Sequence, residues 1–166
     1  MEKTGLWRPW PPFLLSLVLA AAPVCGYISP VDTISPEQRS RNMARIKGKN
    51  TQPEKVVRSL LHRMGYRFRL HSKQLPGKPD IVLPKYKAVI FVHGCFWHGH
   101  EGCRRATIPA TRPDFWEQKI SGNKERDGRN IAAIEELGYR CLIVWQCELK
   151  DVELLKQRLS IFLGGK

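Results

Sequence analysis

Acidic side chains are scarce in this chain of 166 residues. It has 15 aspartates and glutamates against 28 lysines and arginines, which gives a formal net charge of +13 at pH 7. Such an excess favours a polyanionic partner such as nucleic acid, because each phosphate that the protein neutralises releases condensed counterions. A solvated basic surface and attraction to anionic lipid are the two other interpretations of this charge.

The chain also lacks internal repeats, low-complexity tracts and an apolar stretch long enough to span a membrane comfortably. The absence of repeats excludes a solenoid, and a chain of this length can bury a core without disulfide bonds. The apolar run at 13–22 follows Lys3 and Arg8 and is followed by small residues, as in a secretory signal peptide.

Residues 1–30 have two interpretations. If the leader at 1–26 is genuine, the protein is exported after cleavage before Tyr27. If the reading frame is over-extended and translation begins at Val31, the protein is cytoplasmic and associated with the bacterial nucleoid. We expect the second, because residues 31–166 have the features of a single, metal-holding cytosolic domain.

Capping residues and hydrophobic periodicity predict an α/β fold. Ser35 and Thr51 are typical of helix N-caps, and Gly65 and Gly138 are typical of helix ends. The almost wholly apolar last strand is expected to be central, and the element order predicts a mixed central sheet with helices on both faces. The expected helices are 36–46, 52–64, 113–137 and 152–163, and the expected strands are 66–71, 80–83, 88–92 and 140–145.

Oxygen and nitrogen ligands meet between two of these strands. Asp80 begins one strand and Val92 and His93 end the next, so the carboxylate, the Val92 carbonyl and the imidazole should lie close together. Carboxylate and carbonyl oxygens are the ligands that Mg²⁺ prefers. Glu54 could reach the same place, or it could only complete the capping box of its helix. Asp80 could likewise only cap a turn.

Soft metal ligands follow the third strand. Cys95, His100 and Cys103 have the spacing C-x₄-H-x₂-C, which is one ligand short of a tetrahedral zinc site. Cys147, just after the last strand, could complete the site, and so could one of the two other histidines of this stretch. A closed set of four ligands indicates a structural Zn²⁺. The alternative is a set of unrelated thiols with a surface imidazole.

Two histidines then remain for proton transfer. A neutral imidazole is a suitable base near pH 7. If Mg²⁺ at Asp80 binds a scissile phosphate, His98 could deprotonate the attacking water and His93 could stabilise or protonate. Asp127, on the long helix, could orient an imidazole.

Aromatic residues accompany these groups. Phe96 and Trp97 lie in the ligand-rich loop, and Trp116 lies in the long helix beside Lys119 and Asn123. Exposed aromatics among cationic and base-reading side chains can wedge between base pairs and unstack them. The alternative is a small satellite core that packs over the zinc loop.

Together these residues resemble those of the very-short-patch-repair DNA mismatch endonucleases, zinc-containing relatives of the restriction-endonuclease-like superfamily. The resemblance covers about residues 34–150. It rests on Arg41-Asn42-Met43, Leu75 to Asp80, Val89 to His98, Pro109 to Arg112, Phe115-Trp116, and Leu142 to Trp145 with Cys147.

The resemblance implies a DNA mismatch endonuclease with a restriction-endonuclease-like fold. Such an enzyme nicks duplex DNA on the 5′ side of a thymine mispaired with guanine, the lesion left when 5-methylcytosine deaminates, by Mg²⁺-dependent phosphodiester hydrolysis. We expect a monomer with double-stranded DNA as its partner, other mismatch-repair proteins as further partners, and no membrane. The alternatives are a non-catalytic zinc-containing DNA-binding protein and a related nuclease of different DNA specificity.

The resemblance also implies a role for each matching residue. The catalytic positions would be Asp80, His93, His98, Glu54 and Asp127. Mg²⁺ would be bound by Asp80 and the backbone carbonyl of Val92, and Zn²⁺ by Cys95, His100, Cys103 and Cys147. The residues that wedge into DNA or face the mismatch would be Met43, Phe96, Trp97, Trp116, Lys119 and Asn123. The chain departs from some members at Val92, where they have threonine, and in the His100–Cys103 spacing.

Overall fold

The four strands found among the described residues form one mixed sheet. The computed structural model describes residues 35–46 and 48–164, so the expected leader and the start at Val31 lie outside the described residues. The strand order is β1-β2-β3-β4, in which β1–β2 and β2–β3 are antiparallel and β3–β4 is parallel. The strands are β1 (Arg69–Leu70), β2 (Ile81–Leu83), β3 (Ala88–His93) and β4 (Arg140–Trp145).

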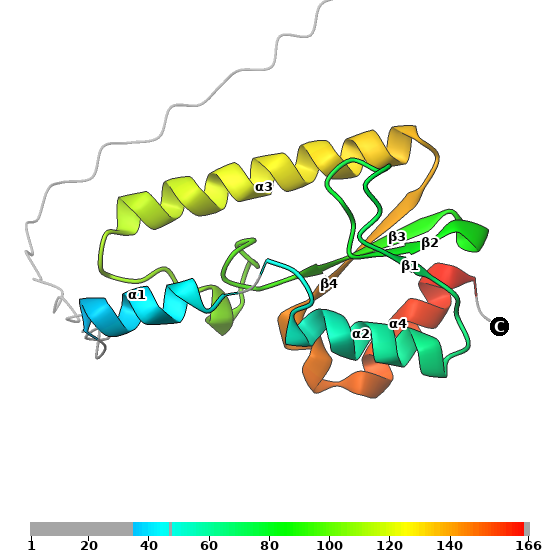
Figure 1. The fold of residues 1–166 in the computed structure, drawn as a ribbon, viewed down its shortest axis with the longest axis horizontal. Coiled ribbons are helices and arrows are strands. Elements are labelled where there is room, and N and C mark those ends of the chain that lie inside the picture. The colour runs from blue at the N-terminus through cyan, green and yellow to red at the C-terminus, as the bar shows by residue number, and fades with distance from the viewer. Residues whose placement is uncertain (1–34, 47, 165–166) are drawn as a thin grey trace, which may run out of the picture.

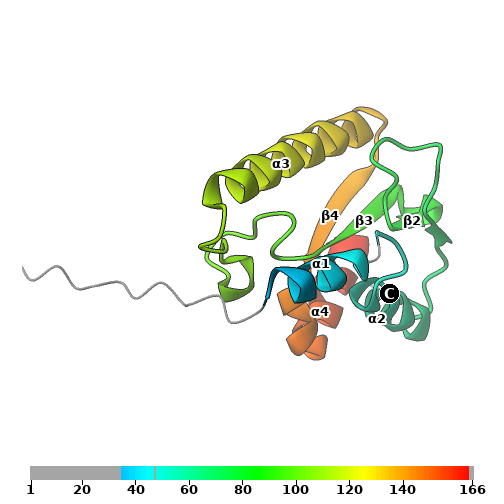
Figure 2. The ribbon, with the colours of Figure 1, turned by 60° about the vertical axis from the view of Figure 1, so that its left-hand side comes forward.

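Helices cover both faces of this sheet, as the sequence predicts. Figures 1 and 2 show the long helix α3 along one face, and α2 and α4 together on the other. Helix α1 lies apart from the sheet, before α2 (Figure 1). The helices are α1 (Pro36–Ala44), α2 (Gln52–Arg63), α3 (Pro113–Glu136) and α4 (Val152–Leu163), and short 3₁₀ turns occupy Pro84–Tyr86, Arg104–Ala106 and Gln146–Lys150.

Alternating strand residues build one core on each face. In β3, Ala88 and Ile90 pack with the apolar residues of α2 and α4, whereas Val89 and Phe91 pack with Ile134 of α3. This is the two-residue period of a strand covered on both sides. The same period directs His93 to the α3 face, and this places its imidazole on the side where the functional groups of α3 lie.

The expected central position of the last strand is wrong. β4 pairs only with β3 and is the edge strand of the sheet that the described residues form. Its apolar run is explained by the helices that cover its two faces. Covered faces require apolar residues whether or not the strand has a second neighbour in the sheet. Arg158 of α4 donates a hydrogen bond from Nη2 to the Ile143 carbonyl at 3.0 Å, so a side chain occupies part of the open edge.

The expected strand at 66–71 is shortened to two residues. Tyr66 is buried and its N–H donates to the Leu61 carbonyl at 3.0 Å, so this part of the chain closes the end of α2 instead of pairing with β2. His71 has a φ of +46°, which ends the extended backbone on the other side. Local alternation of apolar and basic residues did not reveal either constraint.

The N-terminus of α2 forms as its sequence predicts. The Thr51 side chain accepts from the Glu54 N–H, and the Glu54 side chain accepts from the Thr51 N–H, which is a complete capping box. Gly65, just past the helix, adopts a φ of +79° as a C-terminal glycine does. Among the described residues, no helix has the length and apolar character needed to cross a membrane.

Candidate functional site

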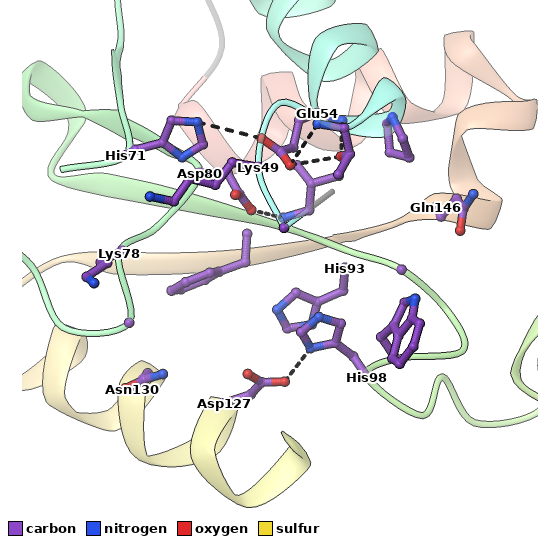
Figure 3. Close-up of a pocket in the computed structure, with 18 of the residues that line it drawn as sticks. Lys49, Glu54, His71, Lys78, Asp80, His93, His98, Asp127, Asn130 and Gln146 are labelled. Atoms are coloured by element: carbon purple, nitrogen blue, oxygen red, sulfur yellow. Dashed lines mark hydrogen bonds and ion pairs between the residues drawn. The ribbon is translucent and has the colours of Figure 1, made fainter. Parts of the chain in front are cut away.

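A cavity of about 610 Å³ opens where β2 begins and β3 ends, between the N-terminus of α2 and the middle of α3. Figure 3 shows its side chains arriving from these elements and from the loop after β3. It brings together most of the residues to which the sequence assigns chemistry. Those that line it are Glu54, Asp80, Val92, His93, Trp97, His98 and Asp127.

Asp80 is held against the end of β3. Its Oδ2 accepts a hydrogen bond from the Val92 N–H at 2.8 Å. Because the N–H and C=O of one strand residue point to the same neighbour, the Val92 carbonyl also points to the edge where Asp80 lies. Burial raises the pKa of the Asp80 carboxyl and the nearby Glu54 raises it further, against the opposing effect of the Val92 N–H. Ionisation of this carboxyl is therefore costly, and a bound cation would offset that cost.

His98 and Asp127 form a short polar contact in the cavity. His98 Nδ1 lies 2.5 Å from Asp127 Oδ2, and the dashed line in Figure 3 marks this contact across the cavity. The His98 ring stacks on the His93 ring with centroids 3.8 Å apart. An imidazole whose Nδ1–H is bonded to a carboxylate has its Nε2 lone pair available for proton transfer. The sequence indicated that Asp127 could orient an imidazole, and the imidazole that it contacts in the structure is that of His98.

His93 is the buried member of this stacked pair. It is 5 % exposed and also contacts the Trp145 ring edge, with centroids 5.4 Å apart. Burial, followed by the neighbouring His98, lowers the pKa of His93 from 6.5 to about 4. His93 is therefore neutral near pH 7.

The Glu54 carboxylate lies at the cavity wall and is saturated with hydrogen bonds. Oε1 accepts from the Thr51 N–H at 3.2 Å and from Thr51 Oγ1 at 2.8 Å. Oε2 accepts from the Asn50 N–H at 3.1 Å and from Arg58 Nη2 at 2.5 Å. Four donors match the usual capacity of a carboxylate. The capping role weighed for Glu54 in the sequence is thus present, together with a place beside Asp80.

Several residues around Glu54 were missed by the sequence reasoning. His71 lines the cavity, and its Nε2 lies 3.8 Å from Glu54 Oε2. Together with Glu54 and Asp80 it forms a group whose ligand-type atoms all lie within 4.8 Å of one another. In the sequence it appeared only as the end of a strand. The cavity also contains Lys78, which lies in the Leu75–Asp80 stretch of the resemblance but had no role assigned to it. Four further lining residues, Lys49, Arg126, Asn130 and Gln146, were not singled out in the sequence.

A second ligand cluster lies outside this cavity. Ligand atoms of Cys95, His100, Cys103 and Cys147 all lie within 4.8 Å of one another, and Cys147 Sγ is 3.3 Å from His100 Nδ1. The register explains the meeting of distant residues. His93 is opposite Trp145 in the parallel pair, and two residues further along each strand the chain reaches a cysteine. Cys147, and not one of the cavity histidines, is the fourth member of this cluster.

This cluster fits a metal ion in its donor chemistry. Three thiols and one imidazole are a common structural zinc set. Burial raises the pKa of the Cys95 thiol to about 11, a cost that a bound cation would offset because it stabilises the thiolate. The His100 ring also stacks on Trp145 with centroids 4.1 Å apart, which holds the imidazole in place.

The loop between the two clusters is fixed to α3. Asn123 is 8 % exposed and donates from Nδ2 to the Trp97 carbonyl at 2.8 Å. Gly99 lies so close to the helix that an added Cβ would stand 2.7 Å from Ile120 Cγ2. These contacts join His98 and His100, on either side of Gly99, to one rigid element.

The aromatic residues of the loop and of α3 pack against one another. Ring centroids lie 5.1 Å apart for Phe96–Trp97, 5.2 Å for Phe96–Trp116 and 6.0 Å for Trp97–Trp116. All three are half-buried, and Trp97 also lines the cavity. Met43, on α1, and Lys119, on α3, are exposed. Contact of these residues with DNA stays a prediction.

Gly99→Ala tests the close approach of the loop to α3. Gly102→Ala is the matched control, because both glycines have positive φ, +58° and +67°, but no atom lies within 4 Å of a Cβ at Gly102. Strain should cost both variants about 1–2 kcal/mol, and the contact with buried Ile120 should cost Gly99→Ala about 1–3 kcal/mol more. Urea unfolding of the zinc-loaded proteins measures the difference, and equal losses in the two variants would contradict the packing.

Asp80→Asn tests the electrostatic strain at the cavity. A carboxyl with a raised pKa destabilises the folded protein once it ionises, so the neutral amide should raise the Tm near pH 7 in buffer without added Mg²⁺. Added Mg²⁺ should raise the Tm of the wild type and leave that of the variant unchanged. A variant that is less stable than the wild type, or an equal response of both to Mg²⁺, would show that Asp80 is not an unpaired charge in a cation site.

Comparison with known proteins identifies relatives of this chain. The family model described as DNA mismatch endonuclease Vsr matches residues 31–105. A Type II nicking enzyme, V.XorIIP from Xanthomonas oryzae pv. oryzae, is 56% identical over 132 residues, covering 80% of this chain and 96% of that protein. DNA mismatch endonuclease Vsr from Escherichia coli is 50% identical over 133 residues, covering 77% of this chain and 85% of that protein.

Among solved structures, the Homing Endonuclease I-Bth0305I Catalytic Domain is similar with a TM-score of 0.49 and 24% identity, over 68% of this chain and 94% of that chain. The sequence relatives carry the assignment, since they match almost their whole length at about half of all positions. The chain therefore belongs to the Vsr family of DNA mismatch and nicking endonucleases, and it is a DNA endonuclease.

Proposed function

We propose that this endonuclease nicks duplex DNA on the 5′ side of the thymine in a T:G mispair, by Mg²⁺-dependent hydrolysis of one phosphodiester bond. The observation that carries the proposal is the His98–Asp127 pair, 2.5 Å apart, which faces the same cavity as Asp80. Phosphodiester hydrolysis needs a base, a carboxylate that orients the base, and a neighbouring cation site with oxygen ligands. A non-catalytic DNA-binding protein has no use for it.

Asp80 and the Val92 carbonyl are the residues that would hold Mg²⁺. Oxygen donors of these two kinds suit this ion, and the raised pKa of Asp80 marks a carboxylate that lacks a positive partner. When bound, Mg²⁺ would offset the negative charge on the phosphate that is attacked. Glu54 is saturated by its four donors, so we assign it to the support of α2 and of the cavity wall.

His98 is the general base in this proposal. Asp127 holds Nδ1–H, so Nε2 can accept the proton of the attacking water, and the imidazolium that forms is stabilised by the carboxylate. His93 remains neutral because its pKa is lowered to about 4. His93 therefore stabilises the site, by stacking on His98 and by a hydrogen bond to a phosphate oxygen. It does not deliver a proton.

The second cluster is proposed as a structural Zn²⁺ site of Cys95, His100, Cys103 and Cys147. Its role is to fix the loop that carries His98 and the aromatic residues. A closed ligand set leaves no open position for substrate.

Recognition of the mispair is assigned to the aromatic cluster and to neighbouring exposed groups. Phe96, Trp97 and Trp116, together with Met43, would enter the base stack beside the mispair, and Lys119 would face the mispair. Asn123 would act through the Trp97 carbonyl that it binds. We further propose that the protein works as a monomer in the cytoplasm, with other mismatch-repair proteins.

A second candidate is the same chemistry with a different recognition sequence. The relative at 56% identity is named a Type II nicking enzyme and not a mismatch endonuclease. Substrate comparison therefore has to include both the mispair and its flanking sequence.

A nicking assay tests the proposal. A labelled duplex with one T:G mispair should be cut once, 5′ to the thymine, in the presence of Mg²⁺, whereas the T:A duplex should remain intact. Asp80→Ala should abolish cutting and retain DNA binding. Equal cutting of both duplexes would contradict mismatch specificity, and full cutting by Asp80→Ala would contradict the metal assignment.

Asp127→Asn tests the proton-transfer pair separately. The amide cannot stabilise the His98 imidazolium, so the single-turnover nicking rate should fall by roughly 10²–10⁴-fold with unchanged DNA affinity. Glu136→Gln, an exposed acid at the end of the same helix, is the control and should keep the wild-type rate. A wild-type rate in Asp127→Asn would remove His98 as the base.

A further inference from the structure

The two carboxylate oxygens of Asp127 face two different groups of the cavity. Oδ2 lies 2.5 Å from His98 Nδ1, whereas Oδ1 lies 3.9 Å from Nη2 of Arg126. The second distance is that of an ion pair and is too long for a hydrogen bond. The carboxylate that orients the proposed base therefore also attracts a guanidinium to the same side of the cavity.

Arg126 belongs to the face of α3 that lines the cavity. The lining residues of this helix follow the spacing i, i+1, i+4 and i+5, which is that of one helix face. They are Arg126, Asp127, Asn130 and Ile131. The Arg126 side chain is 54% exposed, so a substrate that enters the cavity can reach it.

The Arg126 guanidinium has donors that suit a phosphate. Among residues 35–46 and 48–164 it takes part in the ion pair with Asp127 and in no hydrogen bond. A guanidinium presents five N–H donors in a planar fork that matches phosphate oxygens, and it stays charged at every accessible pH. Figure 3 shows Asp80 reaching the cavity from the start of β2 and Asp127 from α3. A phosphate between them would meet the proposed cation on one side and Arg126 on the other.

We propose that Arg126 is a further catalytic residue, which binds a non-bridging oxygen of the scissile phosphate and stabilises the negative charge that develops there. The inference rests on the proposed function for the base and for the cation site. In the reaction, the water oxygen bonds to phosphorus, the water proton passes to His98 Nε2, and the bond from phosphorus to the leaving sugar oxygen breaks. The leaving oxygen takes a proton from solvent, to which His98 later returns its own. Arg126 keeps its charge throughout.

Arg126→Gln tests this role, and Arg129→Gln is the matched control. Arg129 is an exposed arginine of the same helix that is not among the residues lining the cavity. At saturating protein with Mg²⁺, Arg126→Gln should lower the single-turnover nicking rate of the T:G duplex by roughly 10²–10³-fold. Arg129→Gln should keep the wild-type rate. Both variants remove one charge, so both should lose DNA affinity to the same small extent.

Equal nicking rates in the two variants would overturn the proposal. A loss in Arg126→Gln that higher protein concentration restores would also overturn it, because it would show a role in DNA binding alone. Unchanged Tm values of both variants establish that the fold is intact. Arg126→Lys, which keeps the charge without the planar fork, should have an intermediate rate.

Sulfur substitution at the scissile phosphate separates direct contact from an effect through Asp127. Sulfur is a weaker acceptor than oxygen, so the diastereomer with sulfur facing Arg126 should be cut slowly by the wild type. This slowing should shrink in Arg126→Gln and persist in Arg129→Gln. Slowing of both diastereomers that is the same in wild type and Arg126→Gln would show that Arg126 does not touch the phosphate.

Failure of the proposed function would give a different result. A wild type that leaves the T:G duplex intact and nicks a matched duplex refutes the mismatch specificity. The ratio of the Arg126→Gln and Arg129→Gln rates on that matched duplex then decides the role of Arg126 by the same criteria.

Discussion

The loop after β3 has to be held at two places at once, and the rest of the site depends on this constraint. On one side, Cys95 and Cys147 follow paired residues of β3 and β4, so the loop begins beside the end of the sheet. On the other side, Gly99 and the Asn123–Trp97 contact fix it to α3. Only with both anchors does His98 reach Asp127 on the helix while it stacks on His93 at the strand end.

Charge in the cavity is balanced by groups of opposite character on its two sides. On the β2 side, Asp80 has a raised pKa and lacks a permanent positive partner, whereas Glu54 is paired with the guanidinium of Arg58. On the α3 side, burial lowers the pKa of His93, so this member of the stacked pair is neutral near pH 7. The cavity thus places a carboxylate with a raised pKa on the β2 side and the His98–Asp127 pair on the α3 side, the groups to which the proposed hydrolysis assigns the cation and the base.

The features that could be predicted from the sequence were those with a local cause. The capping box of Thr51 and Glu54, the glycine at the end of α2 and the alternation of β3 are written in neighbouring residues. The ligand types in the loop after β3 likewise predicted two clusters. Cys147 could be suggested as the fourth ligand because the end of the preceding strand was predicted. The parallel register then places Cys147 near Cys95.

The features that could not be predicted depend on packing between distant parts of the chain. An apolar run such as that of β4 indicates that both faces of the strand are covered. It does not indicate how many strands pair with it. Arg58, on α2, and His71, just after β1, are 13 residues apart, and no local pattern indicated their contact. Basic residues that line the cavity looked in the sequence like any other part of a strongly basic surface.

The division of the loop's ligands into two separate clusters is the central claim, and zinc-edge X-ray absorption of the purified protein tests it most directly. The account predicts a shell of three sulfur atoms at about 2.3 Å and one nitrogen at about 2.0–2.1 Å, from Cys95, Cys103, Cys147 and His100. A shell of two sulfurs and two nitrogens would mean that His93 or His98 ligates zinc in place of a cysteine, and would contradict the account.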